Sequence, residues 1–332
     1  MNSMKSSDVI QIGQSQIKLG ETRDVELKVS ETYAGVPVNL LVRVIRSKTK
    51  GPTVFLTGAV HGDELNGTGI IREIMLSDLK LEQGSLICVP VVNIFGFENH
   101  SRYLPDRRDL NRSFPGSETG SLAMRLAHII YQEIISQSDF GMDLHTAAVR
   151  RTNYPQIRAN MDQKEIARIA KAFGCEVIIN KERHENSLRE AAIKKGCPTI
   201  LYEAGEVLKL EPRMVQLGVR GVLNVLKVLG MISGKPKEPV YQAVVQERTQ
   251  WIRSDVGGML HFHIRPGDIV RKGDKLATCE RLFSSDAQPI ESPIEGIVIG
   301  LKFHFPKSKR RLKKIRLRSI AKHKKIWQPI LN

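Results

Sequence analysis

A histidine and a glutamate three residues apart, His61 and Glu64, directly follow the apolar run 54–60. A turn at the end of a buried strand can bring an imidazole and a carboxylate to one point, and these donors suit a borderline-soft divalent ion such as zinc. His145 is the third candidate ligand, because it also stands at the end of an apolar segment, 140–145. Three protein ligands leave a fourth position open to water, so the pattern predicts a catalytic metal site.

A second polar group lies in the loop 96–117, which is rich in arginine, aspartate and proline. Asn111 and Arg112 are a credible clamp for a substrate carboxylate, because a guanidinium offers a fork of donors and the neighbouring amide adds another. Arg102 is expected to reach a second anionic group or to polarise the scissile carbonyl. The loop follows a strand end in the same α/β unit as the predicted metal site.

A candidate general base stands at the end of a third apolar segment, 199–203. A carboxylate aimed at the attacking water can take its proton and return it to the leaving amine. Glu203 is favoured over Glu206 because it lies closer to the end of the strand. Asp143, two residues before His145, shares its strand face and is expected to orient that histidine.

The elements that would position these side chains alternate along the chain after a β-rich opening. Apolar runs and helical periodicity predict strands at 38–45, 54–60, 86–92, 140–145 and 199–203, and helices at 67–76, 119–136 and 211–229. Capping-box patterns at Asp162 and Ser187 predict the starts of two more helices. Strands separated by such helices indicate an α/β fold with a mostly parallel or mixed sheet covered on both faces.

The pattern changes after the Gly- and Pro-containing stretch 230–239, a predicted linker. Short strands with turn residues follow, so the sequence predicts three parts: a catalytic domain at 1–234, an all-β module at 240–301 and a basic tail at 302–332. The tail holds twelve of the Lys and Arg residues and no acid, which leaves a net charge of about +4 for the preceding 301 residues, out of +16 in all. A shifted reading frame and a genuine tail that contacts a polyanion are both compatible with this abrupt change.

Several classes of protein are excluded by the composition. No run of 18 or more apolar residues exists, and the first residues lack the apolar segment of a signal peptide, so a cytoplasmic protein is expected. The four cysteines are scattered through apolar contexts and predict buried thiols. The motifs of serine hydrolases and of phosphate-binding loops are absent from the sequence.

The residues at 50–300 resemble the succinylglutamate desuccinylase/aspartoacylase family, relatives of the zinc carboxypeptidases. The resemblance is carried, in the family's order, by Gly-x-x-His61-Gly-x-Glu64, Asp109-Leu-Asn-Arg112-x-Phe-Pro-Gly, Asp143-Leu-His145 and Glu203-x-Gly. It implies a three-layer αβα zinc carboxypeptidase-like domain with a small C-terminal β module similar to a barrel-sandwich, which would end with one further strand.

The same resemblance implies one zinc ion per chain on His61, Glu64 and His145, with substrate contacts from Arg102, Asn111 and Arg112 and with Glu203 as the base. The sequence therefore predicts a zinc-dependent hydrolase that cleaves the amide bond of an N-acyl amino acid or a similar small carboxylate-bearing substrate. The alternatives are a carboxypeptidase or esterase on the same zinc site, or a non-catalytic protein with a polyanion-binding tail.

Overall fold

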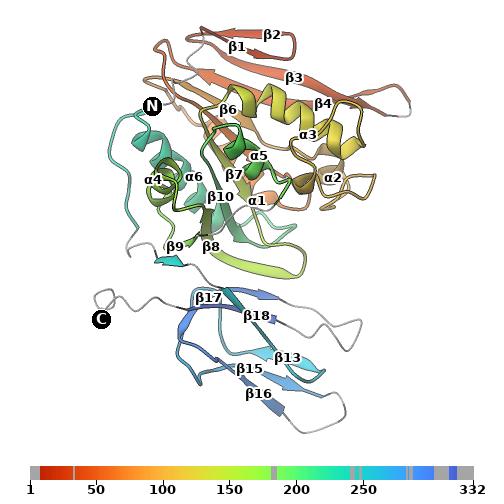
Figure 1. The fold of residues 1–332 in the computed structure, drawn as a ribbon, viewed down its shortest axis with the longest axis vertical. Helices are drawn as coiled ribbons and strands as arrows, with labels where there is room; N and C mark the ends of the chain where they lie inside the picture. Colours follow the sequence, from red (N-terminus) through yellow and green to blue (C-terminus); the bar gives the residue numbers. More distant parts are fainter. Residues whose placement is uncertain are drawn as a thin grey trace.

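The structure is a computed structural model of the chain that describes residues 8–32, 34–180, 185–239, 244–246, 249–281, 283, 287–302 and 314–319. Figure 1 shows two parts along the long axis of the molecule: a larger part that contains the labelled helices, and a smaller part built of strands. The chain enters the smaller part after the last helix, as the sequence predicts.

A mixed sheet forms the centre of the larger part, in the spatial order β3-β4-β6-β5-β7-β10-β8. The four central strands are parallel to one another, whereas β4 and β8 flank them in antiparallel pairings. Continuous apolar runs make the central strands, and every residue of β5 and β6 is buried, as expected where both faces of a sheet are covered. The strands are β3 (Thr22–Glu31), β4 (Pro37–Arg46), β5 (Thr53–Gly58), β6 (Ser85–Val89), β7 (Phe140–His145), β8 (Arg151–Ala159), β9 (Val177–Asn180) and β10 (Thr199–Gly205).

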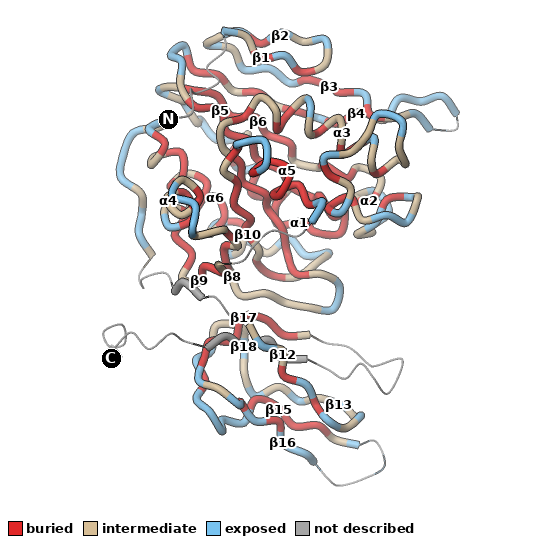
Figure 2. Tube along the Cα trace, viewed as in Figure 1, coloured by how far each residue is buried: buried red, intermediate tan, exposed pale blue. Residues whose placement is uncertain are grey.

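Helices cover both faces of this sheet. The helices α1 (Leu65–Leu76), α4 (Lys164–Phe173) and α6 (Pro212–Val228) share one apolar core, and α2 (Ile94–Glu98), α3 (Leu122–Glu133) and α5 (Leu188–Lys194) contribute to the other. Two short 3₁₀ helices, η1 (Leu110–Arg112) and η2 (Ile135–Gln137), lie on the second side of the sheet. Figure 2 shows the buried residues concentrated in the central strands between these layers. The predicted α/β class with helices on both faces is confirmed.

The two predicted helix starts have different outcomes. Ser187 is the N-cap of α5, and its hydroxyl accepts a hydrogen bond from the Glu190 backbone N–H at 3.2 Å. The helix predicted to start at Asp162 is α4, but its N-cap is Gln163, one residue later, and the predicted capping box is not formed. The Asp162 N–H instead donates to the side chain of Asn160, an Asx turn that keeps Asp162 outside the helix.

The smaller part is the predicted all-β module. Its strands β13, β15 and β16 form a separate three-stranded sheet, whereas β17 pairs antiparallel with β8 and joins the module to the central sheet. The strands after the last helix are β11 (Val244–Gln246), β12 (Thr249–Arg253), β13 (Met259–Phe262), β14 (Ile269–Val270), β15 (Lys275–Glu280), β16 (Ala287–Glu291) and β17 (Gly296–Lys302). Near the start of the chain, β1 (Val9–Ile12) and β2 (Ser15–Lys18) form a two-stranded sheet of their own.

Part of the predicted basic tail forms a strand. The strand β18 (Lys314–Ser319) pairs antiparallel with β17 on one side and with β12 on the other. It occupies the place of the further strand that the resemblance implies, within a segment that was predicted to be a tail. Residues 303–313 and 320–332 lie outside the described residues, so the polyanion contact stays a prediction. No helix within the described ranges combines the length and the apolar character needed to cross a membrane.

Candidate active site

Two neighbouring strand ends bring the three predicted metal ligands together. The parallel strands β5 and β7 lie side by side, with Gly58 opposite Leu144, so their carboxyl ends meet at one edge of the sheet. His145 is the last residue of β7, whereas His61 and Glu64 occupy the turn between β5 and α1. One nitrogen or oxygen atom from each of the three side chains lies within 4.8 Å of the others, and all three residues are buried.

The turn that carries His61 and Glu64 depends on Gly62. This turn packs so closely against α2 that a Cβ atom at Gly62 would lie only 1.9 Å from the backbone carbon of Gly96. Only a residue without a side chain fits this approach. A closely packed turn of this kind holds both candidate ligands in fixed positions.

The carboxylate of Glu64 lies between the two imidazoles. Its Oε1 is 2.7 Å from Nδ1 of His61, and its Oε2 is 2.8 Å from Nδ1 of His145. The backbone N–H of Thr146 donates to the same Oε2 at 2.9 Å. The two Nδ1 atoms and one carboxylate therefore converge as a nitrogen, oxygen and nitrogen donor set.

The other ring nitrogen of each histidine faces a second carboxylate. Nε2 of His145 is 2.7 Å from Asp143, and Nε2 of His61 is 3.2 Å from Asp109. A hydroxyl, that of Thr57, donates to the other oxygen of Asp143 at 2.9 Å. A carboxylate that accepts the Nε2 proton fixes the tautomer whose Nδ1 lone pair is free for a metal, and it raises the basicity of that nitrogen.

The electrostatics of this cluster keep its carboxylates ionised. Burial alone would raise the pKa of the Glu64 carboxyl, but the imidazoles of His61 and His145 lower it well below its usual range. Burial likewise opposes ionisation of Asp109, and its contacts with His61 and Arg102 lower its pKa well below the usual value.

Burial opposes the charged form of His145, but the carboxylates of Asp143 and Glu64 raise its pKa well above the usual value. Because ionised oxygen and neutral imidazole nitrogen are the forms that bind zinc, a zinc ion would have to displace the proton of this imidazole. The three side chains thus fit a zinc ion in the type of their donor atoms, in the spacing of those atoms and in the carboxylates that contact both imidazoles from behind.

The residues predicted to bind substrate lie at the side of this cluster. Arg102 donates to Asp109 at 2.8 and 3.2 Å, and its Nη1 is 3.5 Å from Glu64. Asn111 is buried, and its side-chain oxygen accepts from the backbone N–H of Leu188 at the start of α5, which leaves its amide N–H₂ group for a ligand. Arg112 is exposed and donates to the Asn111 carbonyl at 2.6 Å.

The candidate base lies near the end of β10, next to β8. The guanidinium of Arg158 and the amide of Asn153, both from β8, donate to the same oxygen of Glu203, the former at 2.7 Å. Gly300 of β17 pairs with Asn153 from the other side, where a Cβ atom would lie 2.9 Å from the Asn153 side-chain oxygen. Glu206 instead pairs with Lys209 at 2.7 Å.

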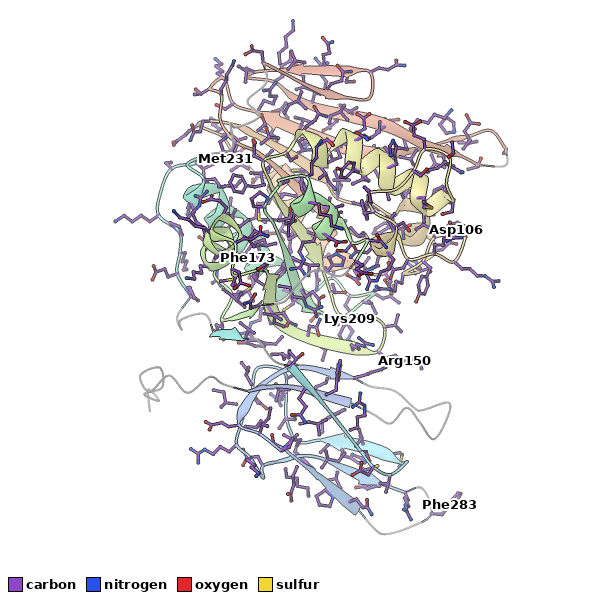
Figure 3. All side chains as sticks on the ribbon, viewed as in Figure 1. Asp106, Arg150, Phe173, Lys209, Met231 and Phe283 are labelled. Carbon is purple, nitrogen blue, oxygen red and sulfur yellow. The ribbon has the colours of Figure 1, made fainter. Side chains whose placement is uncertain are left out.

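A cavity of about 640 Å³ is shared by the candidate metal ligands, the polar residues of the loop 96–117 and Glu203. It is lined by every predicted site residue and by residues that sequence reasoning missed, among them Asp109, Arg151, Asn153, Arg158, Arg189 and Trp251. Asp109 was visible only as part of a motif, and nothing in the sequence linked it to His61. Arg150, the residue before Arg151, lies at the end of the larger part that faces the β module (Figure 3).

Comparisons with known proteins identify the family of the chain and one of its relatives. The family model of the succinylglutamate desuccinylase/aspartoacylase catalytic domain matches residues 50–229. The N-alpha-acetyl-L-2,4-diaminobutyric acid deacetylase of Halomonas elongata is 28% identical over 294 residues, which cover 84% of this chain and 86% of that protein.

Solved structures share the fold over nearly the full length. The product-bound ectoine utilization protein EutE of Ruegeria pomeroyi has a TM-score of 0.80 at 24% identity and covers 95% of this chain and 100% of its own. A succinylglutamate desuccinylase/aspartoacylase from Rhodobacter sphaeroides has a TM-score of 0.76 at 24% identity, with 91% and 96% covered. At these sequence identities the similarity shows that the fold is shared and nothing more.

Proposed function

The chain belongs to the succinylglutamate desuccinylase/aspartoacylase family, and on that premise we propose that it is a zinc-dependent deacylase that hydrolyses the amide bond of an N-acyl amino acid. The observation that carries the proposal is the convergence of His61, Glu64 and His145 in the same cavity as Glu203. The match over 294 residues to a deacetylase supports amide hydrolysis as the reaction class.

The proposed zinc ligands are His61 and His145 through Nδ1, and Glu64 through its carboxylate. A zinc ion bound there would supply a Lewis acid that polarises a carbonyl and lowers the pKa of water toward neutrality. Asp109 and Asp143 would hold the imidazoles in the ligating tautomer from outside.

Glu203 is the proposed general base. Within the described part of the chain, both hydrogen bonds to its carboxylate go to Oε2, so Oε1 is left for proton transfer. It would accept a proton from the attacking water and deliver it to the nitrogen of the leaving amine. The bonds from Arg158 and Asn153 orient the carboxylate for both transfers.

The arginines of the loop 96–117 provide the proposed contacts with the substrate. Arg102 lies 3.5 Å from Glu64 and can stabilise negative charge that develops on the carbonyl oxygen. The fork of Arg112 and the amide group of Asn111 can bind the carboxylate of the amino acid. These contacts would place the scissile amide between the metal ligands and Glu203.

The proposal is tested with the zinc-loaded protein and a panel of N-acyl amino acids. Release of free amino acid, measured with an amine-reactive fluorophore, should occur with wild type and be lost in His145→Ala. Parallel assays on C-terminal peptides and on esters of the same acids separate the alternatives. Turnover confined to peptides or esters, with a full zinc complement, would show that the site is a carboxypeptidase or an esterase.

A further inference from the structure

A second cavity, of about 380 Å³, lies on the face of the central sheet that α6 covers. Its walls come from the first half of β8, the loop between α4 and β9, one side of α6, the linker and the β module. Figure 1 shows β8 and β9 at the end of the larger part that faces the β module. Among the described residues, Asn153 is the only one that lines both this cavity and the candidate active site.

Most of the wall of the second cavity is apolar. The rings of Pro155, Pro239 and Pro266 come from three different segments, namely β8, the linker and the β module, and α6 contributes Met214 and Leu217. A cavity of this size with mainly apolar walls and a few polar groups is the usual form of a site for a small organic molecule. A ligand with an apolar body therefore fits this space better than an inorganic ion.

Two arginines of α6 supply positive charge to the second cavity. Arg213 and Arg220 both line it and are two helical turns apart, which is roughly 10 Å along the axis. Among the residues that the structure describes, neither guanidinium forms an ion pair, and the buried Nε of Arg220 has no hydrogen-bond partner. A half-buried donor without an acceptor costs free energy that a bound anion would recover.

The two acidic residues of the second cavity have other hydrogen-bond partners. Glu176 accepts a hydrogen bond from the hydroxyl of Tyr154, and Glu211 accepts one from the backbone N–H of Glu206 at 2.8 Å. Both carboxylates are therefore held at the wall by neutral donors. The guanidinium of Arg220 is left for an anion that enters the cavity.

Asn153 connects the second cavity with the candidate base. Its side-chain amide donates to Glu203, whereas its side-chain oxygen accepts no hydrogen bond within the described chain. Its neighbours on β10 and β17 are Gly205 and Gly300, which have no side chain to hold the amide from either side. A molecule packed against Asn153 from the second cavity would restrict the amide to the orientation that serves Glu203.

We propose that the second cavity is an effector site for a small carboxylate with an apolar body, and that the bound molecule raises turnover by holding Asn153 against Glu203. The carboxylate of this molecule pairs with Arg220, and its apolar body lies between the proline rings and Leu217. The effect on turnover rests on the proposed deacylase function, whereas the binding does not.

Binding is tested with 3-phenylpropionate and 3-phenylpropionamide, which differ only in whether the end group is an acid or an amide. Calorimetry with the full chain should show that the acid binds roughly ten- to hundredfold more tightly, the range of a hydrogen bond to a charged group. Arg220→Gln should abolish this difference. Arg72→Gln removes the same charge from an exposed position of α1, the helix that packs beside α6, and should keep the difference.

Two further variants locate the bound molecule. Leu217→Trp fills the second cavity and should weaken the binding of both compounds, whereas Arg112→Gln, in the candidate active site, should leave the binding of both unchanged. If the preference for the acid is lost in Arg112→Gln and kept in Arg220→Gln, the probe binds in the active site and the proposal is overturned. Equal binding of acid and amide by wild type, or binding of neither, would overturn it as well.

The effect on Glu203 is measured as turnover of an N-acyl amino acid by the zinc-loaded protein. Saturating 3-phenylpropionate should raise kcat severalfold with little change in KM, and the rise should be absent in Arg220→Gln and in Asn153→Ala. Competitive inhibition, or an unchanged kcat in wild type with the site occupied, would overturn the link through Asn153. If the acid binds as expected but no N-acyl amino acid is hydrolysed, the deacylase function fails and the binding site stands.

Discussion

Replacing Asp143 by asparagine should weaken zinc binding without disrupting the fold. Asp143 is completely buried, and its two oxygens contact Nε2 of His145 at 2.7 Å and the hydroxyl of Thr57 at 2.9 Å. Asparagine has nearly the same size and keeps one acceptor oxygen, but it lacks the negative charge. The imidazole of His145 then becomes a weaker base and a weaker ligand.

The expected size of the effect follows from the position of Asp143 behind one ligand. Loss of such an outer carboxylate costs about 10- to 100-fold in metal affinity, which corresponds to about 1.4–2.7 kcal/mol. Because zinc binds the folded site, the stabilisation of the folded protein by a saturating zinc concentration should fall by the same amount. His145→Ala, which removes the ligand itself, should be more severe.

Competition with a chromogenic chelator measures the zinc dissociation constant, and urea unfolding with and without zinc measures the stabilisation. Asp139→Asn is the matched control, because Asp139 lies just before the same strand and accepts a hydrogen bond from the Thr53 N–H at 2.8 Å, away from the metal ligands. An unchanged zinc dissociation constant in Asp143→Asn would refute the role of His145 as a ligand supported by Asp143. Equal weakening in the control would attribute the effect to the strand.

Three further predictions concern the ligands, the base and the thiols. His61→Ala should lose stoichiometric zinc, by metal analysis after gel filtration, together with activity; a full zinc complement would contradict the ligand assignment. Glu203→Gln should keep its zinc and lose roughly 10²–10⁴-fold in turnover, whereas Glu206→Gln should resemble wild type, and the reverse result would identify Glu206 as the base. The native protein should not react with a thiol reagent at mildly alkaline pH, because all four cysteines are buried and burial raises the pKa of Cys88 to about 12. Rapid labelling before unfolding would show that a thiol is accessible.

The parts of the fold that could be predicted are those in which burial leaves a continuous pattern. The strands β5, β6, β7 and β10 are mostly apolar and buried, since helices cover both faces of the sheet, and each was expected within a few residues of its observed bounds. The strand β8 was not expected, because its sequence is mostly polar and contains Pro155. Three of its polar residues, Arg151, Asn153 and Arg158, line the cavity. The strand therefore lacks the apolar pattern by which a buried strand is predicted.

The same physical reason decides which residues of the candidate site could be predicted from the sequence. His61, Glu64 and His145 could be proposed because each directly follows or ends an apolar run, and parallel strands bring such ends together. Arg151 and Arg158 could not, because their place depends on β8. The contact between Asp109 and His61 spans 48 positions in the sequence and is set by a loop whose path no periodicity encodes.

The pairing of β17 with β8 limits how this protein can change by insertion, deletion or module exchange. Gly300 lies opposite Asn153, which holds Glu203, and a side chain at that position would collide with the Asn153 amide. A single-residue insertion within β17 before Gly300 would shift a bulkier residue into this place. Length variation among natural relatives should therefore collect in the hairpin between β15 and β16, and a chimera with a foreign β module should work only where a glycine arrives in phase with Asn153.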